Sequence, residues 1–286
     1  MVSYCYSPGG VGMQKFLAAF LMICILLTFS ACKKEDVYVK VGVVGENNEQ
    51  WEQVIIPTLE KEGIHIELVQ YNDYVMPNRK LADGEIDMNA FQHYNFLNNW
   101  NEENGEYYNV TLAALCDTLI APLGIYSLHI SSFTELKQGD GVAIMNDDAN
   151  RSRALRMLED AGIITLVDTE NTFVSLSDIA ENPYNLKFFE MEASLTSAAM
   201  RDPAIAIAFL NGTHAKDAGF TNSRALWAEE LDLHNPLTRG LINVIAVRSD
   251  DLNNPVYRRI AEVYHSDDVL ALFDTVYAGI YLPAWE

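Results

Sequence analysis

The chain has 286 residues, a formal net charge of −21 and a hydrophobic fraction of 49%. This charge repels the phosphate backbone of nucleic acids, whose binding requires a basic stripe that the sequence lacks, so nucleic acid is not an expected partner. The length exceeds the common size of one domain, and we expect one large or two medium-sized domains.

The first 31 residues have the pattern of a secretory signal peptide. Lys15 precedes an uncharged apolar run over residues 16–29, and small residues and a cysteine follow it. This is the order of a basic region, a hydrophobic region and a cleavage site. The run is shorter than the roughly 20 apolar residues that a membrane span needs. A buried core helix is the alternative, and a start at Met13 would make residues 1–12 an upstream extension.

The sequence FSAC at residues 29–32 resembles the bacterial lipobox, in which the cysteine is lipidated and becomes the new N-terminus. This resemblance implies that Cys32 carries a lipid anchor and that residues 32–36 link the anchor to the folded body. Cys116 is then the only thiol of the mature chain, so a disulfide framework is excluded. Because no neighbour in the sequence would depress its pKa, we expect Cys116 to act as a small buried hydrophobic residue.

Beyond Asp36, short apolar runs alternate with helical stretches, which is typical of an α/β protein with a largely parallel sheet. The first helical stretch contains Pro57, which predicts a kink or a division, and ends at Gly63. The first group of predicted elements comprises strands at residues 37–44, 64–71, 86–90 and 110–115 and helices at residues 49–62 and 77–81.

A second group of the same kind follows the Pro-Leu-Gly turn at residues 122–124. It comprises strands at residues 141–145, 186–192 and 204–210 and a helix at residues 151–161. The apolar strand at residues 241–248 and the helices at residues 255–264 and 267–277 are expected to return to the first group. No long Gly/Ser linker separates the groups, so short crossing segments must join them, which predicts a hinge. The predicted lobes are residues 37–122 plus 241–286 and residues 123–240.

Polar and aromatic residues gather after the predicted strands, where open α/β sheets place their ligands. Asn150 can cap a helix that begins at Arg151, which would put Arg153 near the start of that helix. The positive end of the helix dipole and the planar guanidinium together favour a bound carboxylate. A solvated arginine on a polar helix face is the alternative.

Three aromatic residues and one histidine are candidates for the wall of such a site. Composition alone favours a core position for Tyr71, Tyr74 and Phe91. In a cleft, however, they would favour a thioether, since sulfur–aromatic contacts contribute roughly 0.3–1.5 kcal/mol each. His93 would either donate a hydrogen bond within the site or serve as a structural histidine.

Two asparagines are further candidates. Asn211 follows an apolar strand, and a turn-forming residue is the alternative there. Asn243 lies inside an apolar strand, where a buried amide must find partners. The histidines show none of the HxxH or HExxH spacings of a metal site, so neither a metal nor a cofactor is expected.

Several motifs together resemble the methionine-binding lipoprotein family, the NlpA-type receptors of methionine importers of the ATP-binding-cassette (ABC) class. They are DYxxPNxxLxxGxIDxNAFQH at residues 73–93, APLGIYS at residues 121–127, and the runs at residues 146–155 and 182–187. The resemblance covers essentially the whole mature chain. It implies a two-lobed, type II periplasmic-binding-protein fold with a hinge and a ligand cleft between the lobes.

The same resemblance implies roles for individual residues. Tyr74, Phe91 and His93 would surround the side chain of one bound methionine. Its carboxylate would bind to Arg153, and Asn211 and Asn243 would make further polar contacts. The chain departs from the family pattern at Trp51, Arg151, Ser152 and His214. These departures leave the identity of the ligand open.

We therefore expect a monomeric, lipid-anchored protein on the extracytoplasmic side of a cell membrane. It would capture methionine, with the L form expected and the D form open, and deliver it to the permease of an ABC importer. An enzyme is the first alternative, but the sequence has no nucleophile elbow, phosphate loop or dinucleotide fingerprint. The second alternative is a lipoprotein of the same fold that binds another small amino acid or peptide, or that acts as a surface interaction protein.

Overall fold

The computed structural model describes residues 1–5, 36–169 and 171–285. Residues Tyr38–Glu286 form one compact unit, separate from Met1–Val37. Most of the predicted signal peptide and the predicted lipidation site, Cys32, lie outside the described residues. Within the described part of the chain, no helix has both the length and the apolar character needed to cross a membrane.

Five strands form the first sheet, in the order β2-β1-β3-β13-β4. β1 runs parallel to β3, whereas β13 is antiparallel to both of its neighbours. The sequence predicted a largely parallel sheet, whereas this sheet is mixed. β13 begins beside the carboxyl ends of β3 and β4 and runs back between them in the opposite direction. The strands are β1 Val37–Val44, β2 Ile64–Tyr71, β3 Met88–His93, β4 Leu112–Asp117 and β13 Asn243–Arg248.

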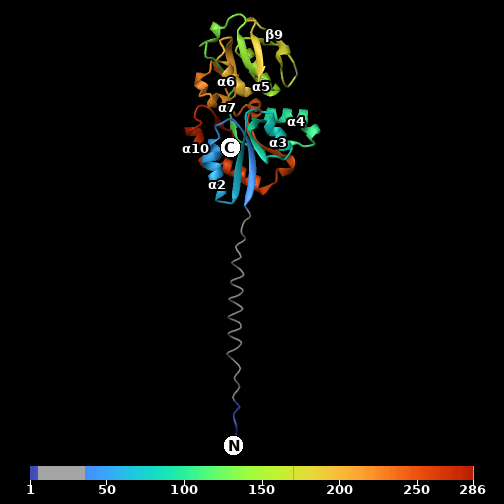
Figure 1. The fold of residues 1–286 in the computed structure, drawn as a ribbon, viewed down its shortest axis with the longest axis vertical. Helices are drawn as coiled ribbons and strands as arrows, with labels where there is room; N and C mark the ends of the chain where they lie inside the picture. The colour runs from blue at the N-terminus through green and yellow to red at the C-terminus, as the bar shows by residue number, and fades with distance from the viewer. Residues whose placement is uncertain (6–35, 170, 286) are drawn as a thin grey trace. The chain divides into compact units, whose positions relative to one another are not determined.

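Helices from both ends of the compact unit pack on this sheet, and α2, α3, α4 and α10 can be found around it in Figure 1. Val244 and Ala246 of β13 share a core with Leu97 and Trp100 of α4. The predicted division at Pro57 is confirmed. A π-helix ends at Ile55, and a short α-helix that contains this proline begins at Ile56. The helices are η1 Gln50–Ile55, α2 Ile56–Glu60, α3 Met76–Ala82, α4 Tyr94–Tyr108, η5 Ser249–Asp251, α9 Pro255–Tyr264 and α10 Asp267–Thr275.

The second sheet also has five strands, in the order β10-β7-β11-β6-β12. β7 is parallel to both β10 and β11, and β6 is antiparallel to β11 and β12. Alternation along β7 places Val142 and Ile144 in one core with α5, while Ala143 joins a second core that includes Ala215 of α7. The strands are β6 Gly124–Tyr126, β7 Gly141–Met145, β10 Lys187–Met191, β11 Ile205–Leu210 and β12 Trp227–Ala228.

The chain passes between the two sheets twice. β4 of the first sheet ends at Asp117 and β6 of the second begins at Gly124; the return runs from Ala228, the end of β12, to Asn243, the start of β13. The fold is therefore α/β with two lobes, as the sequence predicted. The remaining elements are α5 Asp148–Asp160, α6 Ala193–Ala199, α7 Gly212–Asp217, α8 Pro236–Arg239, η2 Phe133–Glu135, η3 Leu176–Asp178, η4 Asn222–Arg224 and the short strands β5 Leu119–Ile120, β8 Thr165–Leu166, β9 Ile179–Glu181 and β14 Leu282–Pro283.

Candidate functional site

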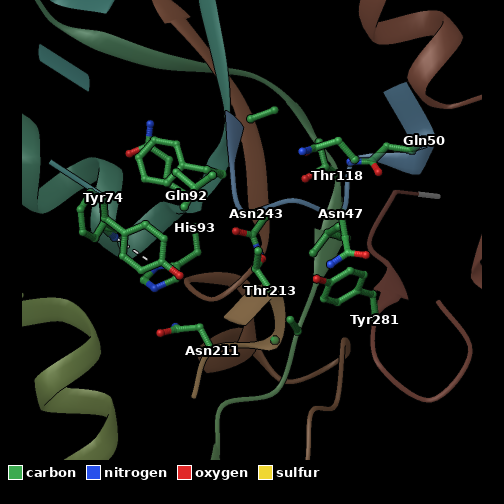
Figure 2. A pocket seen from close by; sticks show the side chains of 18 of the residues that line it. Asn47, Gln50, Tyr74, Gln92, His93, Thr118, Asn211, Thr213, Asn243 and Tyr281 are labelled. Atoms are coloured by element: carbon green, nitrogen blue, oxygen red, sulfur yellow. Dashed lines mark hydrogen bonds between the residues drawn. The ribbon is translucent and has the colours of Figure 1, made fainter. Parts of the chain in front are cut away.

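A cavity of about 70 Å³ lies where segments that follow strands of the two sheets meet (Figure 2). Residues after β1, the end of β3 and the start of β13 line it from the first sheet, and residues of α5 and the loop after β11 line it from the second. The cavity thus lies where the sequence predicted a ligand, beyond the carboxyl ends of parallel strands. Its polar and aromatic lining comprises Asn47, Asn48, Gln50, Tyr74, Phe91, Gln92, His93, Phe96, Thr118, Asn150, Arg153, Asn211, Thr213, Asn243, Tyr264 and Tyr281.

A buried network of three amides fixes the end of β3 that lines the cavity. Gln92 and Asn78 exchange two hydrogen bonds, of 2.7 and 2.6 Å. Asn89 donates to Asn78 at 2.8 Å and accepts from Gln92 at 2.8 Å. All three side chains are buried, so each bond replaces one that water would otherwise make. The network holds Phe91 and His93, on either side of Gln92, at the cavity.

Aromatic rings form one wall of the cavity. Tyr74 and Phe91 are stacked with their ring centroids 5.7 Å apart, and Phe96 meets both rings edge to face. Figure 2 shows Tyr74 beside His93 on this side of the cavity. Such a wall is apolar and polarizable, and it suits an apolar or thioether side chain.

Tyr71 is a correction to the predicted site. Its side chain does not line the cavity but packs, together with Val69, against the core that contains Leu81 and Ile86. Val69 and Tyr71 are two residues apart on β2, so they point to the same face of the sheet. The core position that composition favoured is therefore the observed one for Tyr71, whereas Tyr74 and Phe91 line the cavity.

His93 lies in the cavity wall as a neutral, hydrogen-bonded residue. Its Nδ1 accepts a hydrogen bond from the Phe96 backbone N–H at 3.1 Å and thereby caps α4. Burial, reinforced by the positive charge of Arg153, lowers the pKa of His93 to about 3. With Nδ1 acting as an acceptor, the proton is assigned to Nε2, which lies 3.4 Å from Oδ1 of Asn150.

Arg153 also lines the cavity, but its place on the helix differs from the prediction. α5 begins at Asp148, because the Asp147 carboxylate, rather than Asn150, caps it by accepting the Asn150 backbone N–H at 2.8 Å. Arg153 is consequently in the second turn, beyond the free N–H groups of the helix start. The helix dipole therefore contributes less to an anion at Arg153 than the sequence suggested.

The guanidinium of Arg153 is held from behind the cavity wall. Its Nε donates to Oε1 of Glu229 at 2.5 Å, its Nη2 forms an ion pair with Oε2 of Glu229, and Nη2 also donates to the Ala121 carbonyl at 2.9 Å. The two charged side chains are only 9% and 14% exposed. Nη1 takes part in none of these bonds, and it is the part of the guanidinium left for a ligand.

The two predicted asparagines both line the cavity. Asn211 donates from Nδ2 to Oδ1 of Asn150 at 2.8 Å, while its own Oδ1 is buried without a hydrogen-bond partner. A buried acceptor of this kind costs free energy until a donor reaches it, and a ligand ammonium is such a donor. Asn243 pairs with His93 in the register of β13 and β3, at the edge of the sheet that faces the cavity.

None of the four departures from the family pattern lines the cavity. Trp51 is fully buried in η1 and contacts Tyr264 edge to face. Arg151 forms ion pairs with acidic side chains, and the Ser152 hydroxyl accepts the Val174 backbone N–H at 3.0 Å. The fourth, His214, lies behind the aromatic wall, with its ring 5.4 Å from that of Tyr74.

Sequence reasoning missed several polar residues of the lining. Asn47, Asn48 and Gln50 follow β1, and Thr213 follows β11 at the start of α7. Their position after the ends of central strands was the available signal. Asn150 was identified only as a helix cap, yet its side chain touches both Asn211 and His93. Within the described ranges, no cluster of His, Cys, Asp and Glu could hold a metal ion.

A set of polar contacts, here called the clasp, joins the loop after β1 to α7 beside the cavity. Lys216 donates to Oδ1 of Asn47 at 2.6 Å and to Oε1 of Glu49 at 2.7 Å, and Asp217 accepts from the Asn47 amide. Burial alone would raise the pKa of Glu49, but hydrogen bonding and charge from Lys216 hold it below its usual value. The clasp thus connects the two lobes through charged groups.

Gly45 allows this close approach. Its φ of +84° is in the left-handed region, and an added Cβ would lie 2.4 Å from Cγ2 of Thr213 and 2.8 Å from a carboxylate oxygen of Asp217. A side chain at this position would push the first lobe away from α7. The glycine is therefore part of the geometry that closes the cavity.

Comparisons with known proteins agree with this architecture. A sequence model of the NlpA lipoprotein family matches residues 39–285. The D-methionine-binding lipoprotein MetQ of Salmonella typhi is 34% identical over 255 residues, which are 88% of this chain and 90% of the relative. That of Yersinia pestis is 33% identical over 276 residues, covering 95% of this chain and 98% of the relative.

Solved structures give the same result. The crystal structure of the methionine-binding protein MetQ has a TM-score of 0.79 and 33% identity, covering 87% of this chain and 98% of that one. A nutrient-binding protein of Burkholderia cenocepacia, solved bound to methionine, has a TM-score of 0.78 and 32% identity, with 86% and 100% covered. The chain therefore belongs to the NlpA lipoprotein family.

Proposed function

We propose that this protein is a solute-binding lipoprotein that captures methionine in the cavity between its lobes and delivers it to an ABC importer. The observation that carries the proposal is the cavity itself. It combines a guanidinium, a buried amide oxygen without a partner and a stacked aromatic wall. These three features match the carboxylate, the ammonium and the thioether side chain of one methionine. The names and bound ligand of the relatives support the same solute.

Each part of the ligand has a partner of suitable chemistry in this proposal. Nη1 of Arg153 donates to the carboxylate, in a charge-assisted hydrogen bond. Oδ1 of Asn211 accepts from the ammonium, with Asn243 as a further polar contact. Tyr74 and Phe91 contact the thioether, and the neutral ring of His93 lies beside them with its Nε2–H toward Asn150. A charged ligand side chain would find no partner on the aromatic wall, so we expect strong selection against acidic and basic amino acids.

The lobes are proposed to close around the ligand. Residues 118–123 and 229–242 connect the two sheets, and we place the hinge there, at the boundaries 122/123 and 240/241. A ligand that touches both lobes stabilises the closed form because only that form makes both sets of contacts. The clasp between Lys216 and Glu49 belongs to this closed form.

The placement of the protein in the cell is part of the same proposal. A lipid on Cys32 anchors the chain to a membrane, and the binding lobes act as a monomer on the extracytoplasmic side. The closed, loaded form is the one presented to the permease. No catalytic role is proposed, and incubation of the protein with methionine is expected to return the amino acid unchanged.

Calorimetric titration of the mature protein with L-methionine, D-methionine and a panel of other amino acids tests the proposal. We expect one methionine per chain with a dissociation constant of micromolar or below, about −8 kcal/mol or more favourable. Lysine and glutamate should not bind. The proposal fails if methionine does not bind while another solute of the panel does.

A further inference from the structure

Glu229 lies behind the cavity wall, where the proposed ligand would not contact it. It does not line the cavity, but its carboxylate pairs with Arg153, which does. The carboxylate is also fixed by the backbone, since Oε2 accepts the Leu123 N–H at 2.9 Å. The Glu229 N–H in turn donates to the Leu123 carbonyl at 3.1 Å. Glu229 therefore holds its position independently of Arg153.

Together, Arg153 and Glu229 contribute no net charge to the cavity lining. Arg153 is the cation of the lining, and the titratable residues beside it are neutral. Burial lowers the pKa of His93 to about 3, and burial raises the pKa of each lining tyrosine above its ordinary value. The charge of Glu229 therefore cancels that of Arg153. Behind the lining, the Asp147 carboxylate is directed to the first turn of α5, where two donors of Asn150 satisfy it.

We propose that Glu229 is a specificity-determining residue that makes the cavity select zwitterions over simple carboxylates. The inference rests on the proposed function, in which a carboxylate binds to Arg153. A zwitterionic amino acid adds no net charge to a neutral cavity. A simple carboxylate would place a second anion on a guanidinium that already has one, with no ammonium to offset it. At low exposure this uncompensated charge is costly.

Substitution of Glu229 should therefore change selectivity as well as affinity. In Glu229→Gln the cavity carries one positive charge, which attracts a simple carboxylate more strongly than a zwitterion. The amide can still accept the Leu123 N–H, so the backbone contact that positions residue 229 is retained. A purely structural role of Glu229 would weaken both ligands alike and leave their ratio unchanged.

The experiment is calorimetric titration at neutral pH with L-methionine and with 4-(methylthio)butanoate, which is methionine without its ammonium group. Glu229→Gln is compared with the wild-type protein and with Glu230→Gln, which removes an exposed neighbouring carboxylate. We expect the ratio of affinities, methionine over the analogue, to fall at least tenfold in Glu229→Gln and to stay unchanged in Glu230→Gln.

The inference is overturned if the ratio in Glu229→Gln equals that of the wild-type protein. Should Glu229→Gln fail to fold, as judged by circular dichroism, Glu229→Ala provides the test. It also removes the charge, so the ratio should again fall at least tenfold, and a ratio equal to that of the wild-type protein would reject the argument. Failure of the wild-type protein to bind either ligand would instead reject the proposed function, which separates the two results.

Discussion

Removal of the positive charge from the clasp tests whether contacts between the lobes contribute to ligand affinity. Lys216 bonds to Asn47 and Glu49, and its Nζ lies 5.3 Å from the centroid of the Tyr277 ring. These partners belong to the first lobe, whereas Lys216 belongs to α7 of the second. Lys216→Met keeps a long side chain that can cover the same apolar surface but removes every polar contact.

The magnitude follows from the exposure of the pair. The side chains of Lys216 and Glu49 are 10% and 20% exposed. The contact therefore lies between an exposed ion pair, worth about 0.2–1 kcal/mol, and a buried one, whose disruption costs about 3–5 kcal/mol. We therefore expect the loss of the Lys216 contacts to destabilise the closed form by about 1–3 kcal/mol. If the open form predominates without ligand, all of this energy enters the closing step, and the dissociation constant should rise about 5- to 150-fold.

The assay is calorimetric titration with L-methionine at low and high ionic strength. The wild-type protein should bind more weakly as salt increases, because the clasp is partly exposed and screened, whereas Lys216→Met should lose most of this dependence. Lys61→Met is the matched control, since Lys61 is exposed at the end of α2. If Lys216→Met binds with wild-type affinity and the same salt dependence, the clasp does not contribute to closure.

Three further predictions concern the cavity wall. Arg153→Ala should weaken methionine binding about 10- to 150-fold, the equivalent of about 1.5–3 kcal/mol for a charge-assisted hydrogen bond; unchanged affinity in calorimetry would show that the carboxylate binds elsewhere. Phe91→Leu should reduce the preference for methionine over norleucine about 2- to 12-fold in a competition assay, corresponding to sulfur–aromatic contacts of about 0.3–1.5 kcal/mol. The lowered pKa of His93 means that only the unfolded chain takes up its proton below about pH 6.5, so the free energy of unfolding should fall by about 2 kcal/mol on going from pH 6.5 to pH 5. Denaturant titrations should find that His93→Gln lacks this part of the loss, and an equal loss in both proteins would contradict the assignment.

The strands were predictable wherever apolar runs were short and bounded by turns. β1, β2 and β7 have the predicted bounds, and so does α9, whose start is marked by an asparagine cap and a proline. α4 was missed because residues 94–108 are rich in asparagine, glutamate and tyrosine, and only Leu97 and Trp100 are buried. Such a helix has no continuous apolar stripe, so periodicity does not reveal it.

Only part of the site could be predicted from the sequence: six of its sixteen polar and aromatic lining residues were named, and the contacts between site residues were not. Asn150 was the predicted cap of α5, whereas in the structure the cap is Asp147, three residues earlier in the chain. This moves Arg153 by one turn. Its partner Glu229 is 76 residues away in the sequence, and no local pattern indicates a contact over that separation. Tyr71 and Tyr74 were both candidates for the cavity wall, and residue type alone could not show that the ring of Tyr71 packs against the core beside Val69.

A crystal structure of the protein, produced with ordinary methionine and soaked with L-selenomethionine, tests the central claim most directly. The account predicts one anomalous selenium peak per chain, in contact with the rings of Tyr74 and Phe91, and a ligand carboxylate at the guanidinium of Arg153. An empty cavity, or a peak at another place on the chain, would contradict it.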